Sequence, residues 1–210
     1  MYGGDTRMII PPPILGPDKT AAFPTETVWG LAAPATLAGW NTLRRIKGRA
    51  EGHAFQVSCA SAELALAWAA EPELLRQLSE LWPGPLTLVV QAAADVPTKL
   101  APDGWVGLRV PAHPAAQALL QANGGRLITS SLNRSGEPTA RTEAEARALG
   151  LADYVVPDGG HAPSGQASTV LRVQPGQLEV LRAGPLRAEA LREHLQGHGL
   201  EELKIVGAGL

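Results

Sequence analysis

The chain has 210 residues, of which 45% are hydrophobic and 18% charged, and its 18 Lys and Arg against 20 Asp and Glu give a net charge of −2. This balance argues against a general binder of polyanions while leaving room for a local basic patch, and the apolar content excludes a disordered chain. The 23 glycines and 18 prolines follow no repeating period, so they predict many turns within a single globular domain covering residues 1–210.

The first third of the chain predicts one strand and three helices. Residues 20–23 are a short apolar run before a proline, which is typical of a buried strand. Over residues 37–46 apolar positions recur at a three-residue step, as on one face of a helix. Ser61 is placed to cap a second helix, and Pro72 to begin a third one that ends before Pro83.

The rest of the chain alternates short β-branched or apolar runs with helical patterns. Strands are predicted at residues 87–91, 106–110, 126–130, 154–156, 169–173 and 178–181. Helices are predicted at residues 114–122, 143–149 and 185–195. Strands and helices interleaved at irregular spacing indicate an α/β (α+β) fold in which a twisted mixed β-sheet is flanked by helices.

The cysteine content and the N-terminus indicate the compartment. Cys59 is the only cysteine, so no internal disulfide can form and no thiolate zinc site can be built. No apolar run approaches the roughly 20 residues of a membrane span. The N-terminus lacks a basic start followed by an apolar core, since residues 11–13 are three prolines. We expect a cytoplasmic protein with no membrane partner.

The first candidate site motif is PTETVWGL at residues 24–31, which follows the first predicted strand. Thr25 and Thr27 flank Glu26, placing two hydroxyls and a carboxylate at a turn. Such hydroxyls either bind a polar ligand or close an ST-turn and cap a helix, and turn chemistry alone favours the second role.

The second motif is RRIKGR at residues 44–49, with four cations in six residues and no acid. Lys47 and Arg49 flank a glycine and could point at one anion, and a compact ammonium beside a planar guanidinium suits a nucleotide triphosphate or bicarbonate. A solvated helix end whose cations face the negative end of the helix dipole is an equally good interpretation.

The third motif is ITSSLNRSGEPT at residues 128–139, where hydroxyls and amides follow a predicted strand. It resembles an anion-binding turn without a Walker pattern, or an ordinary polar loop. The glycine-containing segment 158–170 has the same ambiguity. The five histidines show no metal-ligand spacing, and neither GxSxG nor GxxxxGK[ST] occurs, so no metal site is predicted.

Seven motifs in order resemble the YrdC-like threonylcarbamoyl-AMP synthase family over roughly residues 20–187. They are PTETVWGL, KGR, LWPGPLTLVV, VGLRVPAHP, SSLNRSGEPT, DGG followed by STV, and VLRAGPL. The resemblance implies a twisted α/β domain that condenses L-threonine, bicarbonate or CO2, and ATP into threonylcarbamoyl-AMP and pyrophosphate. The enzyme class would be nucleotidyltransferase. The product would pass to threonylcarbamoyl transferase proteins that modify adenosine in tRNA.

The resemblance also assigns residues. It places the cations Lys47 and Arg49 at the triphosphate, as the catalytic pair, and we expect both to be exposed at the site. Arg109 would be a fork for the amino-acid carboxylate rather than the partner of a structural acid. The ATP-binding positions would be Arg49, His53, Thr129, Ser131, Asn133, Thr139 and Arg182. The threonine-binding positions would be Thr25, Ser58, Arg109 and Ser168. Mg2+ would accompany the triphosphate of ATP.

Several residues depart from the family pattern. Trp29 replaces a usual tyrosine, Ala50 a usual proline, and Ser58 a usual histidine on the threonine side. These changes motivate a second hypothesis, an enzyme of the same class that uses a different amine. A third hypothesis is a non-catalytic protein that binds tRNA or double-stranded RNA through the basic cluster at residues 44–49, although the net charge of −2 speaks against it.

Overall fold

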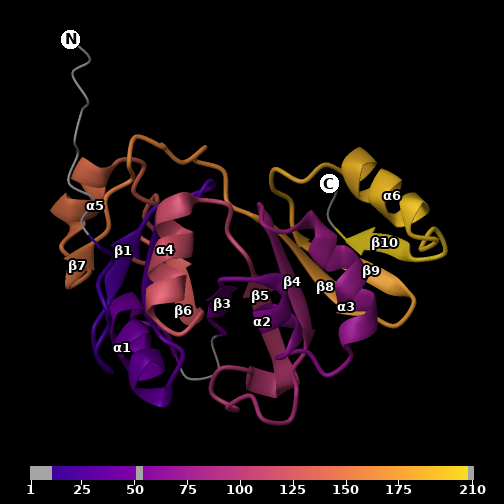
Figure 1. Ribbon diagram of the computed structural model, residues 1–210, viewed down its shortest axis with the longest axis horizontal. Helices are drawn as coiled ribbons and strands as arrows, with labels where there is room; N and C mark the ends of the chain where they lie inside the picture. The colour runs from indigo at the N-terminus through magenta and orange to yellow at the C-terminus, as the bar shows by residue number, and fades with distance from the viewer. Residues whose placement is uncertain (1–10, 51–53, 208–210) are drawn as a thin grey trace.

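The computed structural model describes residues 11–50 and 54–207, and within them ten strands form one mixed sheet (Figure 1). The strands are β1 (Ala21–Phe23), β2 (Gly30–Pro34), β3 (Gln56–Cys59), β4 (Leu86–Gln91), β5 (Trp105–Arg109), β6 (Arg126–Ser131), β7 (Tyr154–Val155), β8 (Thr169–Gln174), β9 (Gln177–Arg182) and β10 (Lys204–Gly207). Their order across the sheet is β10-β9-β8-β4-β5-β3-β6-β2-β1-β7. Four pairings are parallel and five antiparallel, which confirms the mixed α/β sheet.

Helices connect and cover these strands. They are α1 (Leu37–Lys47), α2 (Ala62–Leu66), α3 (Pro72–Leu78), α4 (Pro114–Ala122), α5 (Glu143–Leu149) and α6 (Ala188–Gly197), with short 3-10 turns at Ser79–Leu81 and Pro102–Gly104. The Ser61 side chain accepts a hydrogen bond from Leu64 N, so it caps α2 as predicted, and Pro72 is the first residue of α3. No helix in the described ranges is both long and apolar enough to cross a bilayer.

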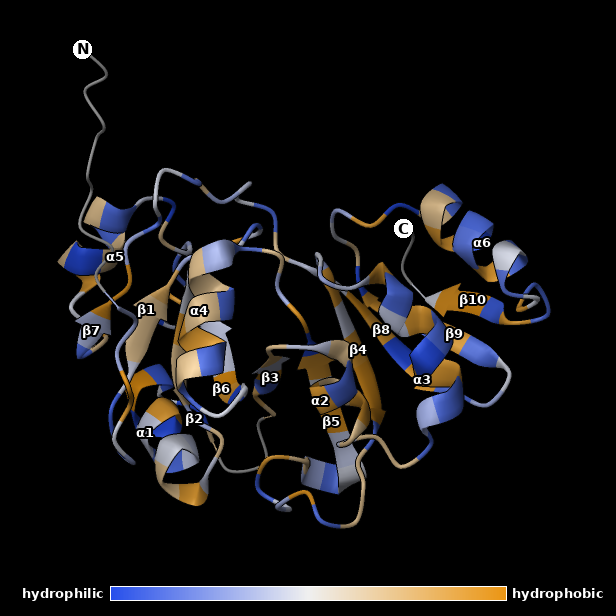
Figure 2. Ribbon diagram, in the orientation of Figure 1, coloured by the Kyte–Doolittle hydropathy of each residue, from blue (hydrophilic) through white to orange (hydrophobic). Residues whose placement is uncertain are grey.

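Alternation along the strands places α1 and α4 on opposite faces of the sheet. On β2, Leu31 packs in the same apolar cluster as Trp40 of α1, whereas the next residue, Ala32, packs with Leu119 of α4. In Figure 2 each helix carries both apolar and polar residues, as expected for helices with one buried side.

The structure corrects the sequence prediction at three strands and one helix start. Strands β2, β3 and β10 were not predicted, and α6 begins at Ala188 rather than at residue 185. The first two residues of β2, Gly30 and Leu31, were assigned to the loop of PTETVWGL, yet β2 is inserted between β1 and β6 and is almost wholly buried. The chain bends at residues 185–186 before α6 begins, and there Leu186 N bonds to the hydroxyl of Thr169.

The centre of the sheet is polar on the face that α4 covers. Leu127 of β6 packs against α4, and Thr129 and Ser131 follow it at two-residue intervals on the same face. On the neighbouring β3, Gln56 lies opposite Thr129 in the register. Since polar side chains from several strands share this face, the sheet builds a polar floor where a hydrophobic core would otherwise continue.

Candidate active site

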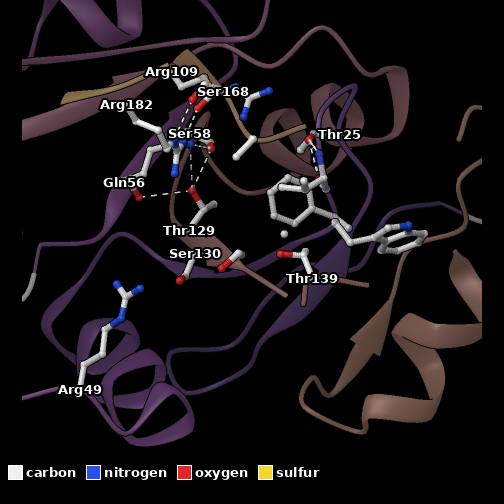
Figure 3. A pocket seen from close by; sticks show the side chains of 16 residues that line it. Thr25, Arg49, Gln56, Ser58, Arg109, Thr129, Ser130, Thr139, Ser168 and Arg182 are labelled. Carbon is white, nitrogen blue, oxygen red and sulfur yellow. Dashed lines mark hydrogen bonds between the residues drawn. The ribbon is translucent and has the colours of Figure 1, made fainter. Parts of the chain in front are cut away.

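A cavity of about 320 Å³ lies over this polar floor (Figure 3). Nine of the predicted site residues line it: Thr25, Arg49, Ser58, Arg109, Thr129, Ser131, Thr139, Ser168 and Arg182. Phe23, Val28, Trp29, Gly30, Gln56, Ser130 and Ala167 complete the lining. Residues that are far apart in the sequence are thus brought together around one space.

Among the described residues, the lining carries positive charge. Its ionisable side chains there are Arg49, Arg109 and Arg182, and no carboxylate, histidine or cysteine of residues 11–50 and 54–207 lines the cavity. Arg109 and Arg182 are close enough for Arg109 to lower the pKa of Arg182, after the larger effect of burial. The arrangement therefore favours an anionic ligand.

Arg109 is a buried cation whose donors are only partly used. Its side chain donates from Nη2 to Glu26 Oε1 at 2.7 Å and to Thr27 Oγ1 at 2.9 Å, and from Nε to Gly84 O at 3.3 Å. The expectation that Arg109 would have no acidic protein partner was therefore wrong. Within the described residues, however, Nη1 makes no hydrogen bond, and Arg109 still lines the cavity.

Glu26 is itself held in place. Its Oε2 accepts from Ala112 N at 3.1 Å, while Oε1 takes the Arg109 bond. The Thr25 hydroxyl donates to Val28 O at 2.6 Å and accepts from Thr27 N, closing the turn of PTETVWGL. The ST-turn is thus confirmed, but the helix cap expected with it was wrong, because the turn leads into β2. The same turn lines the cavity and, through Glu26 and Thr27, orients Arg109.

Lys47 contradicts the expectation of exposure, since only 3% of its surface is accessible. Its Nζ donates to Ser131 O at 2.9 Å, to Asn133 O at 2.6 Å and to Asn133 Oδ1 at 2.7 Å, which uses all three ammonium hydrogens. Burial, with a smaller contribution from Arg49, lowers the pKa of Lys47 to about 8. The RRIKGR and ITSSLNRSGEPT motifs are therefore in contact. However, Lys47 and Asn133 stabilise the turn after β6 and do not line the cavity.

Arg49 projects from the turn that ends α1. Gly48 adopts φ +59°, a left-handed conformation that glycine adopts readily, and it lets the chain leave the helix between the two cations. Arg49 is half-buried, and its guanidinium lies over the Phe55 ring at 5.4 Å. Its side chain makes no hydrogen bond or ion pair to a described residue. Burial lowers its pKa. Of the predicted pair, Arg49 is the cation available to a ligand.

Ser58 and Trp29, the two departures on the cavity wall, are both buried. The Ser58 hydroxyl lies 3.0 Å from Thr129 Oγ1 and 3.3 Å from Gln56 Nε2. Trp29 is wholly buried, and its indole Nε1 has no hydrogen-bond partner. The predicted position His53 lies outside the described residues.

Gln56 is a lining residue that the sequence analysis missed. Its side chain joins Thr87 on one side to Ser58 and Thr129 on the other. The available signal was the two-residue spacing of Gln56 and Ser58 in a strand, which places both on one face.

No group of three or more His, Cys, Asp or Glu side chains in the described chain could hold a metal ion. The cavity offers hydroxyls and guanidinium groups, which do not form a Mg2+ cage.

Residues 14–184 match a family model for Sua5, YciO and YrdC proteins, which is described as telomere recombination. A Pyrococcus abyssi protein named threonylcarbamoyl-AMP synthase is 34% identical over 183 residues, covering 83% of this chain and 53% of that protein. A Xanthomonas euvesicatoria protein of the same name is 34% identical over 165 residues, covering 75% of this chain and 88% of that one.

Solved structures show the same architecture. P. abyssi Sua5 complexed with L-threonine superposes with a TM-score of 0.79 at 30% identity, covering 90% of this chain and 56% of that one. Escherichia coli YciO gives a TM-score of 0.68 at 25% identity, with coverage of 79% and 83%. The chain therefore spans about half the length of the P. abyssi proteins and most of the length of the X. euvesicatoria and E. coli proteins.

Proposed function

The chain belongs to the Sua5, YciO and YrdC family, and from that premise we propose that it is a threonylcarbamoyl-AMP synthase. Its substrates would be L-threonine, bicarbonate or CO2, and ATP with its Mg2+ ion. Its products would be threonylcarbamoyl-AMP and pyrophosphate, the former serving proteins that transfer the threonylcarbamoyl group to tRNA. Relatives that carry this name and a relative solved with L-threonine support the proposal.

The observation that carries the proposal is the distribution of cations in the cavity. Arg109 and Arg182 lie at one end with Ser168, and Arg49 lies apart from them (Figure 3). A reaction that joins an amino acid to a nucleotide needs one site for a carboxylate and another for a triphosphate. The free Nη1 of Arg109 suits the carboxylate, and Arg49 suits the phosphates.

The chemistry requires positioning and charge neutralisation more than a covalent nucleophile. The threonine amino group captures CO2 as a carbamate, and a carbamate oxygen then attacks the α-phosphorus of ATP. The new oxygen–phosphorus bond forms as the bond to the β-phosphate bridge breaks, and pyrophosphate leaves with that electron pair. Arg49 would neutralise the departing phosphates, while Arg109 would hold threonine by its carboxylate.

Pyrophosphate release tests the proposal. Purified protein given ATP, Mg2+, bicarbonate and L-threonine should release pyrophosphate, and omission of bicarbonate should abolish the release. Arg49→Met should lower the rate by about 100-fold, because it removes a charge from the transition state. Arg45→Met, at an exposed cation of α1 four residues before Arg49, is the matched control and should leave the rate unchanged.

The same assay separates the two rival hypotheses. Release with another amino acid in place of threonine would identify a different amine substrate, as Ser58 and Trp29 motivate. Absence of release with any amine, together with tight RNA binding at physiological salt in a filter assay, would support the RNA-binding hypothesis. Pyrophosphate release that does not depend on bicarbonate would refute the proposed synthase activity.

A further inference from the structure

A row of hydrogen bonds crosses the cavity floor from Arg182 to Gln56. Arg182 Nη2 donates to Ser168 Oγ at 2.9 Å, and the hydroxyls of Ser168 and Thr87 are 2.9 Å apart. Thr87 Oγ1 then donates to Gln56 Oε1 at 2.8 Å. The row runs from β9 through Ser168, the residue before β8, to β4 and β3. It passes across Gly107 of β5, which lies opposite both Gln56 and Val89 in the register.

The row has one direction, because a guanidinium can only donate and each hydroxyl has one hydrogen. Thr87 gives its hydrogen to Gln56, so the bond between Ser168 and Thr87 uses the hydrogen of Ser168. In this arrangement the Gln56 amide presents its oxygen to Thr87. Its Nε2 then faces Ser58 Oγ at 3.3 Å and Thr129 Oγ1 at 3.4 Å (Figure 3).

The direction continues to the end of the row. Thr129 Oγ1 donates to the backbone oxygen of Gln56 at 3.3 Å, so the 3.0 Å bond between Ser58 and Thr129 uses the Ser58 hydrogen. All four hydroxyl hydrogens are then used within the protein. Ser58 Oγ accepts one bond, from Gln56, and keeps a second lone pair on the cavity side. This wall of the cavity accepts hydrogen bonds and does not donate them.

We infer that Gln56 is a specificity-determining and positioning residue, which keeps the Ser58 wall an acceptor and so selects an amine substrate whose side chain carries a hydroxyl. The inference rests on the proposed function, in which the carboxylate of the amino acid binds Arg109 at the same end of the cavity. A hydroxyl on the substrate donates to Ser58, whereas a methyl group leaves that oxygen unpaired and a carboxylate places acceptor against acceptor.

Burial makes this selection strong. Ser58 is 2% exposed and Thr87 is 3% exposed, so water does not replace a lost partner freely. A site that hydrogen-bonds a substrate hydroxyl rejects the analogue without it far better than an apolar pocket discriminates between similar groups. Threonine and serine should therefore bind, while valine and aspartate should be rejected.

The test uses two variants that break the row at different points. Gln56→Met removes all three amide contacts at similar side-chain length. Thr87→Val removes a hydroxyl that does not line the cavity. Binding of threonine, serine, valine and aspartate is measured by isothermal titration, and pyrophosphate release is measured in parallel. Gln196→Met, at an exposed glutamine of α6, is the matched control.

Wild-type protein should prefer threonine to valine by at least about 100-fold. Gln56→Met should reduce this preference about tenfold, and Thr87→Val should reduce it less. The double variant should be no less selective than Gln56→Met alone, because both changes interrupt one row. A loss of stability alone would lower binding of all four amino acids without changing their ratios.

An unchanged ratio in folded Gln56→Met, or additive losses in the double variant, would overturn the inference. If Gln56→Met does not fold, the threonine-to-valine preference of Thr87→Val decides. An unchanged preference in that variant would also overturn the inference. Hydroxyl-selective binding without pyrophosphate release would refute the synthase but support the role of Gln56. Pyrophosphate release together with an unaltered threonine-to-valine ratio in Gln56→Met would support the synthase but refute the role of Gln56. If wild-type protein binds none of the four amino acids, both proposals are overturned.

Discussion

The turn around Lys47 and the cavity end at Arg109 bury their cations to almost the same degree, 3% and 4% exposed. They differ in how many donors the protein itself uses. All three hydrogens of the Lys47 ammonium bond to Ser131 and Asn133, whereas Arg109 keeps Nη1 without a bond to any described residue. Arg109 also lines the cavity, and Lys47 does not.

This comparison teaches that the burial of a cation does not reveal its role, while its remaining donors do. A lysine whose hydrogens are all accepted by the protein stabilises the turn that surrounds it. An arginine with a free nitrogen beside a cavity can still bind an anion, even when it has an acidic partner, because its fork has five hydrogens. Both residues were assigned to substrate, and of the two only Arg109 keeps a donor that bonds to no described residue and lies beside the cavity.

The largest expected effect is on the stability of the Lys47 turn. Lys47→Met removes a buried ammonium that donates to Asn133 O, and it also removes one of the two donors to each of Ser131 O and Asn133 Oδ1, so the free energy of unfolding in urea should fall by about 2–4 kcal/mol. Arg45→Met, on the exposed side of the same helix, should change it by less than about 0.5 kcal/mol. Equal stability of the two variants, with ATP affinity lost only in Lys47→Met, would reverse the comparison.

At the Arg109 end the effect should be on binding. Arg109→Lys keeps a positive charge near Glu26 but lacks the free second nitrogen of the fork. The dissociation constant for threonine should rise by about 10- to 100-fold in isothermal titration, with the circular dichroism spectrum unchanged. Arg109 would instead be structural if the variant melted at a lower temperature and bound threonine as before.

Gly184 tests how tightly the backbone beside Arg109 is packed. A Cβ at this position would lie 2.3 Å from Thr169 N and 2.6 Å from Ala167 O, so Gly184→Ala must displace the segment that carries Ser168. Unfolding measurements should show a loss of about 1–3 kcal/mol, accompanied by weaker threonine binding. Gly197→Ala, where a Cβ meets no atom within 4 Å, is the control and should not destabilise the protein.

The smallest effect concerns the contact between α6 and the turn after α3, remote from both cations. The backbone carbonyl of His194 and then the Glu80 carboxylate raise the pKa of His198. A raised pKa stabilises the folded state below the unfolded pKa of about 6.5, and this contribution is lost as pH rises through the folded value. Melting curves of wild type and Glu80→Gln should therefore differ at pH 5.5 and coincide at pH 8.5. Threonine binding should be the same in both proteins.

Much of the fold could be predicted from local pattern. Helix α4 and helix α5 begin and end where proline, capping and apolar spacing predict. Strand β2 could not be recognised, because Gly30 and Pro34 are poor strand formers and only insertion between two other strands makes the segment a strand. Strand β10 depends in the same way on pairing with β9.

By itself, the sequence determined the residue types of the site and the family to which they point. Arg49, Arg109, Ser168 and Arg182 were identified from motifs, and all four line one cavity. What the sequence could not determine was the direction of each hydrogen bond. Lys47 stabilises a turn because the end of β6 presents a carbonyl oxygen to its ammonium. Gln56 contacts Thr87 because the register of β3, β5 and β4 places the two side chains on either side of Gly107. Such pairings depend on the register of strands distant in sequence, and only the tertiary structure decides that register.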